Sequence, residues 1–407
     1  MLKSKKPLIS KISHELVYLS LLFIPLQALK LPFFSHIYES LQLDISTFLL
    51  MISLILSFLC NKINKNFAAI LILLIFVEAL VFLYFSFQPY LKFYYYLLIY
   101  SFYFAMYFLV DNYTLDKKKL FNIVLCGLVF TSALILIQIQ TYPHFLRPKG
   151  FMNEPTTAGL LLFSGVFAGF IANFYRPYFK KITIFFLSSL MFFSAIFTRS
   201  MLIIPFFILI IISFSLFYIL KPINKIIFIK LIAFLSATIF FLTHFNDLYY
   251  GHIVERLFLD RTVNFSLLSY LACFDQLKTA IELSPYFGLS VGSMGYFPYV
   301  SANESILSLY STFNSNAYDA YSLFFRLIIE FGLFLPLILV LFLIFIITKF
   351  IKLIKTKNTH EDIFLFFNSA AIIVFCLSKG ASVSHAYLFT NFFIFLFYIK
   401  KQLKNKI

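Results

Sequence analysis

The chain of 407 residues is poor in charge and contains no tryptophan. Only 12% of its residues are charged, against roughly 25% in a usual soluble domain, whereas 61% are hydrophobic. A soluble core of this size could not cover so much apolar surface, so we expect the lipid bilayer to act as its solvent. The composition excludes an ordinary soluble domain and predicts a polytopic integral membrane protein.

Cysteine is also scarce, and the four residues Cys60, Cys126, Cys273 and Cys376 lie far apart. This spacing fits neither a disulfide framework nor a zinc site, so we expect no metal. The sequence has no Walker loop, no glycine-rich dinucleotide turn, and neither HExxH nor GxSxG. We therefore expect no cofactor, and nucleotide use is disfavoured.

Long apolar runs take the place of these motifs. A helix needs roughly 20 apolar residues to cross a bilayer, and about twelve runs fit this length. They lie near residues 15–33, 45–60, 67–88, 92–110, 120–140, 156–174, 182–198, 200–220, 226–243, 323–348, 363–378 and 386–400. Backbone groups cannot remain unpaired in lipid, and no run shows the alternation of a barrel strand. The fold class predicted is an all-α membrane protein.

Basic residues give the orientation of these spans. The basic start MLKSKKPLISKISHE has no small-residue cleavage site, so residues 1–14 are predicted to be a cytoplasmic tail. With this end inside, most of the 33 basic residues fall on the inner side, including the tail 401–407. This bias accounts for the net charge of +16, so we expect no nucleic-acid partner.

A single transmembrane domain with one large outer loop is predicted. Residues 15–243 hold the first nine spans, residues 244–322 form the loop, and residues 323–400 hold the last three spans. Loops of this length are usually functional or disordered, and this one is rich in Tyr, Phe and Leu. Residues 265–283 predict an amphipathic helix in it. Its apolar stripe comprises Leu267, Leu268, Leu271, Phe274, Leu277 and Ile281, and largely opposite lie Asp275, Gln276, Lys278 and Glu282.

Charges at the outer ends of spans are the candidate site residues, because a charge there is costly without a partner. Arg147 and Lys149 precede the span at 156–174. Either their side chains simply extend to the membrane surface, or they bind an anion. Arginine and a helix N-terminus are both suited to binding phosphate. Arg199 lies in a hairpin with almost no loop and no acidic neighbour in sequence, which favours a ligand or a distant partner.

The outer loop holds further charged and titratable residues. His252, Glu255, Arg256 and Arg261 precede its predicted helix, and Asp319 lies where the loop meets the next span. Some of these residues will form ordinary ion pairs. Together with Arg147 and Arg199, they predict a site for an anionic group at the outer face, with acids or bases nearby.

Three sequence blocks resemble the O-antigen polymerase and ligase family (Wzy-like and WaaL-like) over roughly residues 120–350. RPKGFMNEPTTAGLLL is similar to its Arg-x-x-Gly-x-x-x-x-Pro block, and FTRSMLIIPFF to its Ser-Arg-Ser hairpin. SPYFGLSVGSMGYF and the later YSLFFRLIIEFGLFLPLILV resemble its Pro-x-x-Gly-x-Gly turn and Glu-x-Gly-Leu helix. The order of the blocks, the twelve spans and the single large loop also match.

The sequence departs from the family pattern in two places. The first departure favours a polymerase over a ligase, and the second changes which arginines are candidates in the loop. Ligases usually carry His-Asn about eleven residues before the Glu-x-Gly glycine, and here Tyr321 and Ser322 stand there. The family's loop arginine is replaced by Tyr270, so Arg256 and Arg261 are the nearest substitutes.

The resemblance implies a glycosyltransferase that moves a growing glycan from undecaprenyl pyrophosphate to the non-reducing end of a lipid-linked repeat unit. It implies a bacterial inner-membrane protein with both termini in the cytoplasm, and a chain-length regulator (Wzz-like) and a flippase as partners. Arg147, Lys149, Arg199, Arg256 and Arg261 would bind the pyrophosphate. Glu255, Asp319 and His252 are the candidate bases for the attacking hydroxyl.

Two alternatives remain open, an O-antigen ligase and a transporter of lipid-linked oligosaccharides. A transporter is expected to bury charges in mid-span and to show two related halves. The spans here are nearly free of charge, and one large loop breaks any such symmetry.

Overall fold

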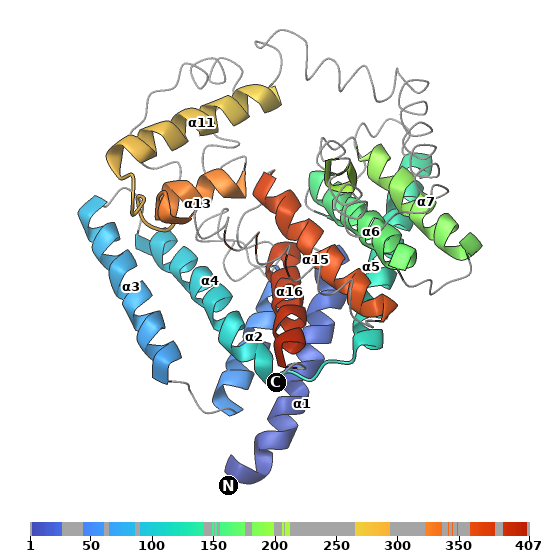
Figure 1. Ribbon diagram of the computed structural model, residues 1–407, viewed down its shortest axis with the longest axis horizontal. Helices are drawn as coiled ribbons and strands as arrows, with labels where there is room; N and C mark the ends of the chain where they lie inside the picture. Colours follow the sequence, from blue (N-terminus) through green and yellow to red (C-terminus); the bar gives the residue numbers. More distant parts are fainter. Residues whose placement is uncertain are drawn as a thin grey trace.

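The computed structural model is a bundle of apolar helices (Figure 1). The structure describes residues 2–26, 44–60, 65–85, 90–141, 149, 151–152, 155–175, 181–198, 206, 208–211, 265–293, 322–335, 341, 344, 348, 359–378 and 386–404. Within these ranges it contains no β-strand, and six helices are long and apolar enough to cross a membrane. The described part of the chain is therefore all-α and membrane-embedded, as predicted.

Most described helices occupy ranges that the apolar runs predict. They are α1 (Leu2–Phe23), α2 (Ile45–Cys60), α3 (Lys65–Phe85), α4 (Tyr90–Leu109), α5 (Lys117–Thr141), α6 (Pro155–Tyr175), α7 (Lys181–Phe197), α11 (Phe265–Leu283), α13 (Leu323–Phe331), α15 (His360–Ser378) and α16 (Ala386–Lys404). The predicted spans 200–220 and 226–243 and most of the loop 244–322 lie outside the described residues. The count of twelve spans stays a prediction.

The interior of the bundle is formed by α6, α15 and α16, whereas α3 lies at its edge (Figure 1). Small polar side chains join neighbouring helices of the bundle. Ser46 donates to the backbone carbonyl of Ser20 at 2.7 Å, and Ser164 donates to the Asn368 side chain at 3.1 Å. In lipid, helices associate by close packing and by polar contacts of this kind, because apolar side chains gain nothing by leaving lipid for one another.

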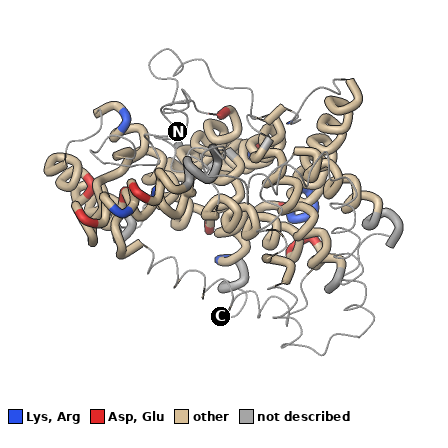
Figure 2. Tube along the Cα trace, turned by 90° about the horizontal axis from the view of Figure 1, so that it is seen from above, with Lys and Arg blue, Asp and Glu red and all other residues tan. Residues whose placement is uncertain are grey.

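The two ends of the bundle are distinct. α1 begins and α16 ends at one end, which we call the terminus end, and α11 lies across the opposite end above α13 (Figure 1). Along the described part of the chain, Lys, Arg, Asp and Glu residues occupy only short stretches of the trace (Figure 2).

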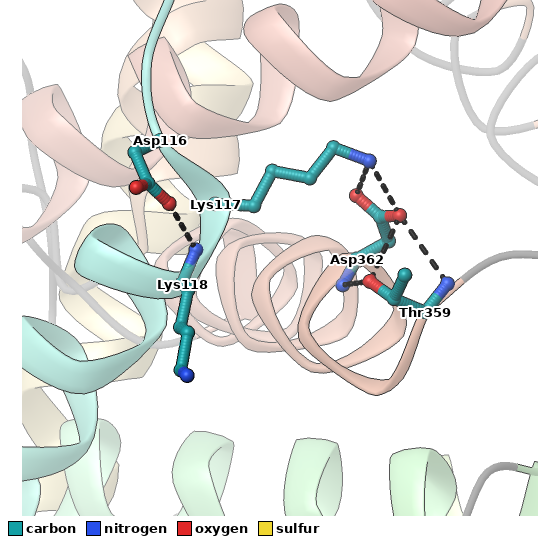
Figure 3. Close-up of polar contacts among 5 residues, drawn as sticks. All are labelled: Asp116, Lys117, Lys118, Thr359 and Asp362. Atoms are coloured by element: carbon teal, nitrogen blue, oxygen red, sulfur yellow. Dashed lines mark hydrogen bonds and ion pairs between the residues drawn. The ribbon is translucent and has the colours of Figure 1, made fainter.

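The terminus end holds lysine–carboxylate pairs that link different helices. Lys117 on α5 donates to Asp362 on α15 at 2.6 Å, and Asp362 also exchanges hydrogen bonds with Thr359 in a capping box that starts α15 (Figure 3). Asp116 caps α5 by accepting from the Lys118 backbone N–H at 2.8 Å (Figure 3). These lysines belong to the segments predicted to be cytoplasmic.

Three sequence expectations differ from the structure. The first concerns the basic start, predicted as a cytoplasmic tail over residues 1–14: it forms the first turns of α1, and its side of the membrane stays a prediction. Ser13 of this segment is buried, and its hydroxyl donates to the Ser53 carbonyl at 2.9 Å. Packing against α2 thus extends the helix outward beyond the apolar run.

The second difference concerns the predicted span 323–348, which is divided near its start. α13 ends at Phe331 because Gly332 adopts a φ of 73°, and the Gly332 N–H closes the helix on the Ile328 carbonyl at 2.7 Å. A glycine in the left-handed conformation is a common helix terminator. Hydropathy does not detect this break, because the apolar run continues past the glycine.

The third difference lies in the buried face of α11. The helix occupies the predicted range, and its Cys273, Leu277 and Ala280 cluster with residues of α13, while Ile281 packs against this cluster. Phe274, predicted on the apolar stripe, is half exposed. The buried face therefore keeps Leu277 and Ile281 of the predicted stripe and adds the small residues Cys273 and Ala280 and the buried Gln276.

Candidate functional site

The third sequence block folds into one unit at the end of the bundle opposite the termini. Residues 284–293 form a turn after α11, and this turn packs against the end of α13. The Leu289 N–H donates to the Ile329 carbonyl at 2.8 Å, and the Leu333 N–H donates to the Pro285 carbonyl at 2.9 Å. The two halves of the block, more than thirty positions apart in sequence, are thus joined by backbone hydrogen bonds.

Two glycines make this approach possible. Gly288 and Gly332 both have positive φ, at 70° and 73°. A Cβ on Gly288 would overlap the backbone of Glu330, and a Cβ on Gly332 would overlap the Tyr286 carbonyl. Only glycine tolerates both the conformation and the contact. Gly288 of the Pro-x-x-Gly turn and Gly332 of the Glu-x-Gly motif therefore allow the backbone of the turn to contact the backbone at the end of α13.

A fully buried ion pair lies under this turn. Arg326 and Glu330, one helical turn apart on α13, are 1% and 0% exposed, and the Arg326 Nε donates to the Glu330 Oε1 at 3.0 Å. Glu330 also accepts from the Tyr100 hydroxyl at 2.6 Å and from the Gly292 N–H at 3.0 Å. Such a pair is tolerated in a low-dielectric interior only when further hydrogen bonds satisfy it. Glu330 thereby connects α13, α4 and the turn.

A second cation, Lys92, lies near this pair, because Arg326 and Lys92 both contact the ring of Tyr96 on α4. The Arg326 guanidinium lies 4.1 Å from the centre of the Tyr96 ring, and the Lys92 ammonium lies 5.8 Å from it. Both distances are within the range of cation–π attraction. Lys92 is itself buried, so two positive charges are concentrated around one ring.

A second carboxylate reaches the turn from α3. Glu78 accepts a hydrogen bond from the Val291 N–H at 3.3 Å, next to the Gly292 N–H that binds Glu330. Glu78 lies within the candidate span Ala68–Phe85, where an acidic residue marks a functional position more often than not. Two carboxylates therefore accept hydrogen bonds from the turn, and two cations lie beside the Tyr96 ring.

Of the predicted site residues, the structure describes Lys149. Its backbone N–H donates to the Gln138 side chain at 3.0 Å, and its carbonyl accepts from Met152 at 3.1 Å, so the segment before α6 is tied to α5. The remaining seven lie outside the described residues: Arg147, Arg199, His252, Glu255, Arg256, Arg261 and Asp319. Their roles stay predictions.

Sequence reasoning missed most of the buried junction. It quoted the block that contains Arg326 and the Glu330–Gly332 motif but gave neither a site role, and it passed over Lys92 and Glu78. A usable signal exists for Glu78, the one acidic residue within α3, and for Arg326 and Glu330, whose spacing of four places both on one helix face. Nothing in the sequence indicates that Tyr96 and Tyr100 would meet them.

The junction is built of charged side chains and backbone N–H groups. Across the described part of the chain, no group of three metal-binding side chains comes together. The chain matches no protein-family model, and no curated protein matches its sequence.

Proposed function

We propose that the protein is a polysaccharide polymerase of the O-antigen polymerase type, which extends a glycan carried on undecaprenyl pyrophosphate at the outer leaflet of a bacterial inner membrane. The observation that carries the proposal is the junction between the turn and α13. The two halves of the third sequence block, Pro285–Gly292 and Glu330–Gly332, fold together into a buried charged unit at the end of the bundle opposite the termini.

The proposed reaction is a glycosyl transfer. A hydroxyl of the incoming repeat unit attacks the anomeric carbon of the donor glycan, and its proton passes to a base. The bond between that carbon and the pyrophosphate oxygen breaks, and the lipid pyrophosphate leaves with the electron pair. Cations stabilise the charge that develops on the leaving group, which is the role proposed for Arg147, Arg199 and a loop arginine, Arg256 or Arg261. Glu255, Asp319 and His252 remain the candidate bases.

Ser322 bears on the ligase alternative. This residue stands at one of the two positions where ligases carry His-Asn, and its hydroxyl donates to the Leu377 carbonyl at 2.7 Å. It is buried at the start of α13, where it joins this helix to α15. A side chain engaged in this way supports a structural role at that position and favours a polymerase.

A transporter is the second candidate, because the described spans do contain buried charges. Glu78 and the Arg326–Glu330 pair are the kind of feature expected in a transport pathway. Glu330 accepts three hydrogen bonds from three different parts of the chain, however, which suits a rigid element better than a moving one.

The test is deletion of the gene in its native host, with surface polysaccharide resolved by length. A polymerase predicts the loss of long chains with a cap of one repeat unit retained. A transporter predicts that the cap disappears too, and a normal ladder in the deletion strain contradicts both functions.

For the site, we expect Arg199→Ala to abolish chain extension at normal protein level. The control is Lys118→Ala, which removes an exposed cation at the terminus end. A wild-type ladder from Arg199→Ala would remove Arg199 from the mechanism.

A further inference from the structure

The turn at residues 284–293 lies alongside the candidate membrane spans rather than beyond their ends. Its Val291 N–H donates to Glu78 at 3.3 Å, and Glu78 belongs to the candidate span Ala68–Phe85 of α3. Phe85 follows Glu78 by seven residues. A helix rises by about 1.5 Å per residue, so the contact lies roughly 10 Å from this end of the span. A loop that stayed outside the membrane would not reach this level.

The neighbouring helix α4 gives a second measure of the same depth. Gly292 of the turn packs closely on α4, where an added Cβ would lie 3.0 Å from the Tyr96 ring and 3.4 Å from the Lys92 carbonyl oxygen. Tyr96 is six residues inside the candidate span Tyr90–Asn112, which is roughly 9 Å from its start. Because α3 ends and α4 begins at the end of the bundle opposite the termini (Figure 1), the two helices place the turn at one level.

The backbone of the turn meets the conditions for irregular structure at membrane depth. Such backbone is tolerated only where it is buried in protein and its polar groups are paired. Residues 288–293 are buried, and three of their N–H groups donate to acceptors on α13 and α3. One acceptor is the Ile329 carbonyl, and the other two are the side chains of Glu78 and Glu330. These two acidic residues therefore complete the hydrogen bonding of a backbone that lies between spans.

The two exposed side chains of the turn are aromatic. Tyr286 and Phe287 are each more than half exposed, and their ring centres lie 5.9 and 6.0 Å from that of Phe334, which is exposed to a similar degree. α3, which contacts the turn, is apolar and largely exposed along its span as far as Tyr84. Exposed apolar rings are costly in water, whereas tyrosine is enriched where the hydrocarbon of a membrane meets the headgroups. The apolar surface of α3 thus continues onto the turn.

We propose that residues 284–293 form a re-entrant turn, which enters the membrane from the end opposite the termini and presents Tyr286, Phe287 and Phe334 to lipid. The partner of this surface is the bilayer itself, at the boundary between acyl chains and headgroups. The predicted outer loop 244–322 is then divided, because one of its segments lies within the membrane. This inference goes beyond the proposed function and does not depend on the reaction.

The test uses the absence of tryptophan from the chain, which lets one introduced indole report its surroundings without background. Phe287→Trp is purified as the full-length protein and reconstituted into phosphatidylcholine vesicles with or without bromine on the acyl chains. We expect brominated lipid to lower its emission about twofold, and aqueous iodide to quench it little. Lys278→Trp, at an exposed position on α11, is the matched control and should show the opposite pattern.

The outcomes separate lipid from the other possible occupants of this surface. Equal quenching of the two variants by brominated lipid, with both open to iodide, overturns the proposal and places the rings in water, where a sugar or a protein could cover them. Protection of Phe287→Trp from both quenchers also overturns it, because the ring would then be covered by protein. Phe334→Trp, in the same ring cluster, supplies the measurement if Phe287→Trp does not fold. No transfer activity is measured, so failure here leaves the deletion phenotype, and with it the proposed function, unaffected.

Discussion

The terminus end and the opposite end of the bundle use charge in different ways. At the terminus end, Lys119 pairs with Glu15 at 2.8 Å, and both side chains are about half exposed, at 44% and 52%. At the opposite end, Arg326 and Glu330 are almost completely buried. Exposed pairs contribute little to stability, whereas a buried pair must be satisfied on every side. The exposed lysine–glutamate pair therefore contributes little to stability, whereas the arginine–glutamate pair holds a specific local structure.

The largest effect should come from breaking the buried pair. Glu330→Ala leaves Arg326 as a buried charge without its partner, and we expect a loss of about 3–5 kcal/mol in the free energy of unfolding. Thermal unfolding of the purified protein in detergent measures this. The double variant Arg326→Met/Glu330→Leu should recover most of the loss, because it removes both charges. Equal stability of Glu330→Ala and the wild type would contradict the assigned pairing.

An intermediate effect should follow from removing one donor to Glu330. Tyr100→Phe deletes the hydroxyl that donates to the carboxylate at 2.6 Å while it keeps the ring. A hydrogen bond to a charged group is worth about 1.5–3 kcal/mol, so we expect a loss of this size in the same unfolding assay. Tyr94→Phe is the matched control, since Tyr94 is 61% exposed on the same helix. A loss equal in the two variants would show that the bond to Glu330 contributes nothing.

The smallest effect should be at the terminus end. Glu15→Gln removes the exposed pair with Lys119, and we expect a change of at most about 0.5 kcal/mol that fades as salt is added. Lys119 keeps its contact with the Tyr18 ring, 3.9 Å from the ring centre, so the variant tests the ion pair alone. A loss as large as that of Glu330→Ala would erase the distinction between the two ends.

The junction also shows how far sequence reasoning reaches. The motifs Pro285-x-x-Gly288 and Glu330-x-Gly332 are visible in the sequence, and the range of α11 follows from its composition. The partners of these motifs are not visible. Gln276 reads as a surface residue and is buried, because the face that α11 turns toward α13 is decided by the fit between the two helices.

The sequence by itself determined that this is a membrane protein built of helices, because apolar runs longer than the bilayer thickness admit no other solution. It also determined which segments are basic. Only the tertiary structure decided that Glu78 on α3, Tyr100 on α4 and Glu330 on α13 converge on one turn. The physical reason is that hydropathy depends on composition along the chain, whereas a buried charge is stabilised by donors that distant segments bring to it.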